Sequence, residues 1–183
     1  MNLGFDVDGV IADFVSGFAK VVKRNYGMVL REKDVCYHDL GLVLGISRKK
    51  KTKIIRETLL EDLPRIAGAS DSLNRLYDEG HRIIIMTARP RDFAEATREW
   101  LKSSSIPYSK LIFSDHERVS LDAIDFDIIV EDNLENAIEW SEKAKKVLLY
   151  DHPWNTSINI ERLFIRVYHW NDILKEIRLG FGN

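Results

Sequence analysis

Short apolar runs alternate with amphipathic segments along most of this chain. Residues 81–86 contain a continuous apolar run at 83–86, as in a strand that is buried on both faces of a sheet. In residues 10–26, by contrast, apolar side chains such as Phe14 and Phe18 recur at helical spacing. These patterns predict strands at 2–7, 81–86, 110–114, 126–130, 147–150 and 164–167, and helices at 10–26, 68–80, 91–102, 134–144 and 170–179.

This alternation of strands and helices predicts an α/β fold, a Rossmann-like parallel sheet with helices on both faces. The segment 14–67 departs from the alternation, because most of it is more polar and looks helical only in pieces. We therefore predict a core made of residues 1–13 and 68–183 and a small helical cap, residues 14–67, inserted after the first strand. A cap over the strand ends would exclude water and select the substrate.

Composition narrows the class of protein. The net charge of −2 gives no overall attraction to nucleic acid or to an anionic membrane, and the basic run 48–53 is interpreted as a solvated helix face. No apolar run approaches the roughly 18 residues of a membrane span, and the N-terminus does not have the shape of a signal peptide. The single cysteine, Cys36, fits a reducing compartment. We expect a cytoplasmic protein with neither a membrane nor a nucleic-acid partner.

Polar residues follow three of the predicted strands at the point where each strand ends. Asp6 and Asp8 follow the first strand, Thr87 the second, and Glu131 and Asp132 a later one. The carboxyl ends of parallel strands line the ligand crevice of an open sheet, so we expect these side chains to converge. Neighbouring carboxylates repel one another unless a cation compensates, and oxygen ligands favour Mg²⁺. The sequence therefore predicts a magnesium site that can also hold a phosphate.

The same residues carry a resemblance to a known superfamily. The run Asp-Val-Asp-Gly-Val that starts at Asp6 resembles the first motif of the haloacid dehalogenase (HAD) superfamily. Thr87 resembles its second motif, and the acidic pair at 131–132 resembles its fourth. Two longer stretches, 5–14 and 151–155, resemble the 5'(3')-deoxyribonucleotidase family and its bacterial relatives. The likeness covers nearly the whole chain and is weakest in the insertion.

The resemblance implies a HAD-type fold and a magnesium-dependent phosphomonoester hydrolase. Its best-matching substrate would be a nucleoside 5'- or 3'-monophosphate, deoxynucleotides included. The resemblance makes Asp6 the nucleophile, which would form an aspartyl-phosphate intermediate. It makes Asp8 the residue that protonates the leaving oxygen and later activates water, and that binds Mg²⁺ through its backbone carbonyl.

The resemblance also assigns the metal and phosphate ligands. Asp132 would be the second carboxylate on the metal, with Glu131 beside it or in hydrogen-bonded support. Thr87 would hold a phosphate oxygen, helped by the backbone N–H of Ala88. Fixed donors of this kind stabilise the charge on a transferring phosphoryl group.

One departure from the family pattern concerns a cation. The pattern has a lysine ahead of the last acidic pair, where it pins the nucleophile and the phosphate. The corresponding region reads Asp-His-Glu-Arg and ends at Arg118, while Lys110 lies one strand earlier. We assign the role to Arg118, although arginine differs from lysine in reach and shape.

Several residues near the motifs are open to two interpretations. Arg89 either binds a substrate phosphate or carboxylate, or pairs with a surface acid. Phe14 and Phe18 either stack on a nucleobase or form the core of the insertion. Asp13 either touches the substrate or stabilises the start of its helix, and the second role is favoured. The remaining residues are given structural roles: packing (Trp154, Trp170), fixing of a loop (Asn155), and a surface or loop position (His152).

Two alternatives to a nucleotidase remain. A HAD phosphatase could act on another small phosphometabolite or on a nucleic-acid end. A non-catalytic protein could bind a phosphate ligand on the same fold, and the missing lysine is its only support. The presence of both Asp6 and Asp8 favours an enzyme whose partner is a small-molecule phosphate ester, in first place a nucleotide. The sequence leaves the oligomeric state open.

Overall fold

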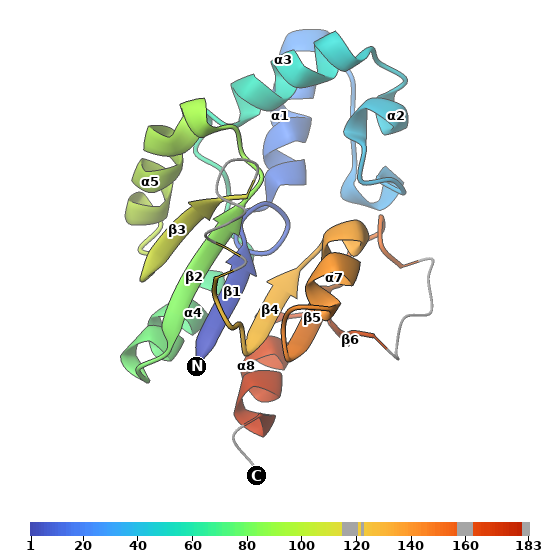
Figure 1. The fold of residues 1–183 in the computed structure, drawn as a ribbon. Coiled ribbons are helices and arrows are strands. Elements are labelled where there is room, and N and C mark those ends of the chain that lie inside the picture. Colours follow the sequence, from blue (N-terminus) through green and yellow to red (C-terminus); the bar gives the residue numbers. More distant parts are fainter. Residues whose placement is uncertain (115–120, 122, 157–162, 181–183) are drawn as a thin grey trace.

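The centre of the molecule is a parallel sheet of six strands in the order β3-β2-β1-β4-β5-β6 (Figure 1). The computed structural model describes residues 1–183 apart from 115–120, 122, 157–162 and 181–183. The strands are β1 (Asn2–Asp6), β2 (Arg82–Thr87), β3 (Lys110–Phe113), β4 (Ile128–Glu131), β5 (Lys146–Tyr150) and β6 (Ile165–Val167). The predicted α/β fold with a Rossmann-like parallel sheet is confirmed.

Helices cover both faces of this sheet. Successive strand residues point to opposite faces, so Ile85 of β2 joins one buried cluster and Ile84 joins the other. The first cluster includes residues of α4, α5 and α8, and the second includes residues of α7. These helices are α4 (Ala69–Asp78), α5 (Ala94–Ser103), α7 (Leu134–Ser141) and α8 (Trp170–Leu179), and a 3₁₀ turn, η2 (Arg91–Phe93), precedes α5.

The insertion after β1 has a buried cluster of its own and lies beyond the carboxyl ends of the strands (Figure 1). It contains α1 (Phe14–Tyr26), η1 (Glu32–Asp34), α2 (Leu40–Leu44) and α3 (Arg48–Thr58). The chain leaves and re-enters the core at adjacent points. The backbone N–H of Asp13 donates to the Pro64 carbonyl, and that of Ile66 donates to the Ile11 carbonyl, both at 2.8 Å.

The first helix begins later than its apolar pattern suggests. Val10, Ile11 and Ala12 fit the helical spacing, but they form a loop whose side chains are fully buried in the main core. The helix α1 begins at Phe14, because the Asp13 side chain accepts a hydrogen bond from the Ser16 backbone N–H at 3.0 Å and caps it. The expected start at residue 10 is therefore wrong, and the expected helix-stabilising role of Asp13 agrees with this cap.

Several basic residues of α3 make contacts at its surface. Lys51 pairs with Asp39 at 2.7 Å, and Arg56 pairs with Asp92. The Lys50 ammonium lies 4.2 Å from the centre of the Tyr26 ring. Among the helices of the described residues, none has the length and apolar character needed to cross a membrane.

Candidate active site

The reversal of strand order at the centre of the sheet places the candidate site. The strand β1 lies between β2 and β4, and the chain builds outward from it in both directions. In open parallel sheets, ligands bind outside the carboxyl ends of the strands at such a switch point. Asp6 ends β1, and Glu131 ends β4 beside it, with Asp132 as the next residue.

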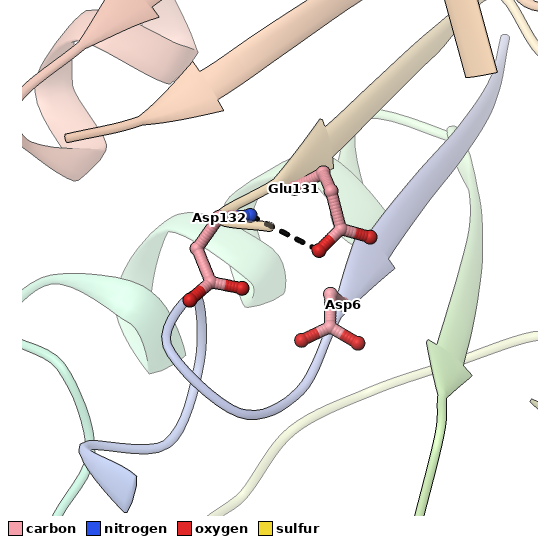
Figure 2. A group of neighbouring side chains, drawn as sticks. All are labelled: Asp6, Glu131 and Asp132. Carbon is pink, nitrogen blue, oxygen red and sulfur yellow. Dashed lines mark hydrogen bonds between the residues drawn. The ribbon is translucent and has the colours of Figure 1, made fainter. Parts of the chain in front are cut away.

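Three carboxylates meet at this point. One oxygen from each of Asp6, Glu131 and Asp132 lies within 4.8 Å of the others (Figure 2). The Glu131 side chain is held in place, because its Oε1 accepts hydrogen bonds from the backbone N–H groups of Asp132 and Asn133, each at 3.1 Å. The predicted convergence of strands distant in sequence is thus present in the structure.

The crowding of these acids changes their protonation. Burial, with the charges of Glu131 and Asp8, raises the pKa of Asp6 well above its usual range. Burial and the charge of Asp6 raise the pKa of Asp132 in the same way. Burial and the charge of Asp132 raise the pKa of Glu131 to about 8. A cluster of oxygen ligands with this excess of negative charge fits a hard divalent cation such as Mg²⁺.

Asp8 lies beside this cluster and is held by Arg89. The guanidinium donates from Nε to Oδ2 at 2.8 Å and from Nη2 to Oδ1 at 2.6 Å, a bidentate pair. The Arg89 side chain is 3% exposed. Arg89 is thus paired with an acid of the site itself, which neither sequence-based interpretation of this residue had foreseen.

Thr87 ends β2, next to β1, and begins the turn that carries Ala88 and Arg89 into the cavity. Its side chain is buried, and its hydroxyl oxygen accepts the backbone N–H of Arg89 at 3.2 Å. Thr87 itself is not among the residues lining the cavity, whereas Ala88 and Arg89 are.

Two residues, Lys110 and Arg118, could replace the lysine of the family pattern. Lys110 opens β3 beside Ile84, three residues before the pairing of Phe113 with Thr87 at the carboxyl end of the sheet. It therefore lies at the wrong end of its strand to reach the acids. Arg118 lies outside the described residues, so its assignment stays a prediction. The basic residues that line the cavity among the described part of the chain are Lys51, Arg65, Arg89 and the histidines His38 and His152.

A cavity of about 760 Å³ opens above the acids. Its floor is formed by the strand ends, and its opposite wall includes apolar side chains from the insertion. Phe14 lines this cavity, whereas Phe18 is fully buried in the cluster inside the insertion. We therefore keep Phe14 as a candidate substrate contact and assign Phe18 to the core. The apolar wall includes Phe14, Val35, Leu40, Ile55 and Leu59.

Sequence reasoning missed the part that the loop after β5 plays at this site. His152 was expected in a loop or at the surface; it is in a loop but is only 8% exposed. Trp154 was interpreted as packing, yet its indole N–H donates to Asp132 Oδ2 at 3.0 Å. The signal available was the match of residues 151–155 to a family motif, which does not show what the side chains contact.

A comparison with known families now identifies the chain. The family model described as "5' nucleotidase, deoxy (Pyrimidine), cytosolic type C protein" matches residues 1–179. The chain belongs to this nucleotidase family. It is accordingly a phosphomonoester hydrolase of the HAD superfamily, as the resemblance predicted.

Individual relatives of this nucleotidase-family chain agree in length as well as in sequence. It is 25% identical over 177 residues to a nucleotidase of Clostridium acetobutylicum, covering 94% of this chain and 91% of the relative. It is 25% identical over 178 residues to a 5'(3')-deoxyribonucleotidase of Bacillus subtilis, covering 96% and 97% of the two chains.

Solved structures share the fold of this nucleotidase-family chain. A HAD family hydrolase from Deinococcus radiodurans R1, solved with bound phosphate and sodium, superposes with a TM-score of 0.65. The match covers 98% of this chain and 95% of that one at 12% sequence identity. The likeness confirms the HAD-type architecture.

Proposed function

We propose that this protein is a magnesium-dependent nucleotidase that works through an aspartyl-phosphate on Asp6. Its proposed substrates are nucleoside 5'- and 3'-monophosphates, deoxynucleotides included. The observation that carries the proposal is the meeting of Asp6, Glu131 and Asp132 within 4.8 Å at the floor of a cavity with an apolar wall. The 5'(3')-deoxyribonucleotidase of Bacillus subtilis, similar over nearly its whole length, supports the substrate class.

The proposed chemistry takes two displacements at phosphorus. In the first, a carboxylate oxygen of Asp6 attacks phosphorus and the ester P–O bond breaks, while Asp8 gives a proton to the departing oxygen. In the second, water attacks phosphorus, Asp8 takes up its proton, and inorganic phosphate leaves with Asp6 restored. A bound Mg²⁺ would neutralise the repulsion between the Asp6 carboxylate and the phosphate dianion.

The neighbouring residues support these displacements. Arg89 donates hydrogen bonds to both carboxylate oxygens of Asp8 and so fixes the position of the Asp8 side chain beside Asp6. We therefore assign Arg89 to positioning Asp8 rather than to binding phosphate. The turn that begins at Thr87 would present the backbone N–H of Ala88 to a phosphate oxygen, as donors fixed before the reaction do.

The shape of the cavity supports a substrate with a phosphate at one end and a flat, apolar group at the other. A volume of about 760 Å³ lies within the range of small-molecule sites. The acids occupy the floor, and Phe14 and the aliphatic side chains of the insertion line the far wall. A nucleoside monophosphate has a phosphate at one end and a flat base at the other. A nucleic-acid end is less well supported, because within the basic run 48–53 Lys51 is paired with Asp39 and Lys50 lies over the Tyr26 ring.

Phosphate release from a panel of monoesters tests the proposal. With Mg²⁺ present, we expect 5'- and 3'-deoxynucleotides to be hydrolysed with a higher kcat/KM than sugar phosphates, and we expect EDTA to stop all release. A 5'-phosphorylated oligonucleotide should be a poor substrate at every salt concentration. Preferred hydrolysis of sugar phosphates would reject the nucleotide assignment, and full activity in EDTA would reject the magnesium assignment.

The acid cluster also predicts how stability depends on pH. Glu131 has a pKa of about 8 in the folded protein against 4.5 as its ordinary value, and the pKa values of Asp6 and Asp132 are raised as well. The folded state therefore binds more protons than the unfolded state in this range. Stability is greatest below about pH 4.5 for these groups and is lost as the pH rises through about 8.

Thermal unfolding in EDTA and in MgCl₂ measures this effect. We expect the increase in Tm given by Mg²⁺ to be larger at pH 8 than at pH 5, because the cation offsets charges that exist only at the higher pH. Glu131→Gln is the matched variant, and its Tm in EDTA should fall less over the same range. The pKa values of His38 and His81 are lowered by burial and oppose the trend, but they are common to both proteins. Equal pH slopes in the two proteins would contradict the assignment.

A further inference from the structure

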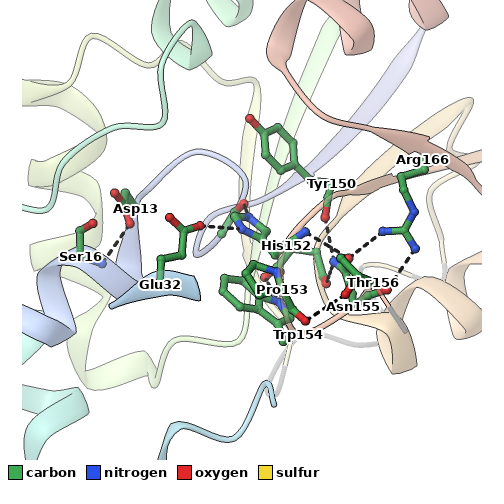
Figure 3. A network of polar contacts seen from close by, with 12 residues as sticks. Asp13, Ser16, Glu32, Tyr150, His152, Pro153, Trp154, Asn155, Thr156 and Arg166 are labelled. Carbon is green, nitrogen blue, oxygen red and sulfur yellow. Dashed lines mark hydrogen bonds and ion pairs between the residues drawn. The ribbon is translucent and has the colours of Figure 1, made fainter. Parts of the chain in front are cut away.

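The loop after β5 lines the same cavity as the acid cluster, and a network of polar contacts holds it in place (Figure 3). Asn155 is 1% exposed, and its amide donates to the carbonyls of Asp132 and Tyr150, each at 2.8 Å. Its side-chain oxygen accepts from the His152 backbone N–H at 3.1 Å and from Arg166 at 2.9 Å. The loop is therefore fixed to the backbone of the residue that carries the third carboxylate.

Trp154 contacts the carboxylate of that residue directly. Its indole Nε1 donates to Asp132 Oδ2 at 3.0 Å. Trp100 and Trp170, by contrast, donate their indole N–H groups to backbone carbonyls, those of Leu63 and Val10. An indole has a single donor, and at Trp154 it is used on an acid of the site.

Gly9 lies close to the same oxygen. A Cβ at Gly9 would lie 2.3 Å from Asp132 Oδ2, closer than from Oδ1 at 3.2 Å. Oδ2 thus lies against Gly9 and also accepts the Trp154 N–H, and these two contacts together restrict the orientation of the carboxylate. In that orientation an oxygen of Asp132 is directed towards Asp6 and Glu131 (Figure 2).

His152 contacts both Trp154 and Gly9. Its ring stacks on Trp154 with centroids 4.1 Å apart and an interplanar angle of 9°. Its Nε2 lies 2.7 Å from the Gly9 carbonyl, so Nε2 carries the proton and donates it. Nδ1 lies 3.3 Å from Glu32 of the insertion (Figure 3). One imidazole therefore fixes the Gly9 loop and the plane of the indole together.

We propose that Trp154 is a positioning residue for the cation site, and that stacking on His152 keeps it in place. Its N–H engages Oδ2 of Asp132, so that the carboxylate presents its other oxygen to the cation in a fixed direction. Residues that orient a metal ligand in this way commonly change metal affinity by about 10- to 100-fold when they are lost. The inference rests on the proposed function, because it needs a cation between Asp6 and Asp132.

Trp154→Phe tests the role, because it removes the N–H and keeps an aromatic face for His152. By calorimetric titration with MgCl₂ alone, we expect Mg²⁺ binding to weaken about 10-fold or more. The Mg²⁺ concentration for half-maximal turnover should rise in parallel, while the substrate KM at saturating Mg²⁺ stays unchanged. Trp140→Phe is the control, since that ring packs on Phe126 at 5.8 Å in the core and does not line the cavity.

A second pair of variants tests the stacking. His152→Phe keeps a flat ring against Trp154, so it should retain more Mg²⁺ affinity than His152→Ala. Urea unfolding in EDTA shows whether each variant is folded before its titration is interpreted.

The outcomes separate the two proposals. Unmodified protein that binds no Mg²⁺ would overturn the proposed function. Unmodified protein that binds Mg²⁺, with Trp154→Phe binding it equally well or losing no more than Trp140→Phe, would overturn only the role of Trp154. Equal losses in the two His152 variants would overturn the stacking.

Discussion

Asp6→Asn is expected to lower phosphate release by three orders of magnitude or more, because the amide cannot attack phosphorus as a carboxylate does. The loss should lie in kcat, since the cavity and its apolar wall are unchanged. Measurement of inorganic phosphate released from a deoxynucleotide and from a generic aryl phosphate, both with Mg²⁺, gives the result. Release at the unmodified rate would reject Asp6 as the nucleophile.

The Asp6→Asn protein should remain folded. The raised pKa of Asp6 means that its charge costs stability in the metal-free protein, so a neutral amide should leave the Tm in EDTA unchanged or higher. Asp13→Asn is the matched control. It removes one negative charge from the same cavity, but asparagine can still cap α1 as Asp13 does. The control should keep most of its activity.

Gly9→Ala is expected to damage the site nearly as severely, although it adds only one carbon atom. The new Cβ would lie 2.3 Å from Oδ2 and 2.6 Å from Cγ of Asp132, so the carboxylate would have to leave its position. The backbone at Gly9 also has φ +100°, a conformation that costs a residue with a side chain about 1–3 kcal/mol. We expect kcat/KM to fall by roughly 100-fold, as for a misplaced ligand of a reacting centre, and Mg²⁺ binding to weaken.

Gly80→Ala separates the two causes. Gly80 has φ +84°, close to that of Gly9, but a Cβ there would meet nothing within 4 Å. The control should therefore lose about 1–2 kcal/mol of stability and keep its activity and its Mg²⁺ affinity. If Gly9→Ala changed only the free energy of unfolding in urea, the contact with Asp132 would not matter for the reaction.

The fold could be predicted from sequence because its signals are local. The run 83–86 is apolar throughout since this part of β2 is buried on both faces, and the alternation with amphipathic helices follows from the layers. The acids could be brought together for a similar reason. Parallel strands end at the same edge, so Asp6 and Asp132 had to be neighbours if β1 and β4 were adjacent.

The side-chain partners could not be predicted in this way. The pairing of Arg89 with Asp8 joins residues 81 positions apart, and nothing in either local sequence selects it over a surface acid. The same holds for Trp154 and Asp132, where packing and hydrogen bonding give the same sequence pattern. At Ile11 the apolar pattern gave a wrong start for the first helix. A buried loop residue and a buried helix residue are both apolar, so the pattern cannot distinguish them.

The two ends of the insertion are hydrogen-bonded to each other through Asp13, Pro64, Ile11 and Ile66. These backbone hydrogen bonds close the whole insertion, residues 14–67, at its base. The entropy of closing such a loop changes slowly with its length. Residues can therefore be gained or lost at the far side of the insertion while the catalytic acids keep their spacing, so that substrate preference can change independently of the reaction.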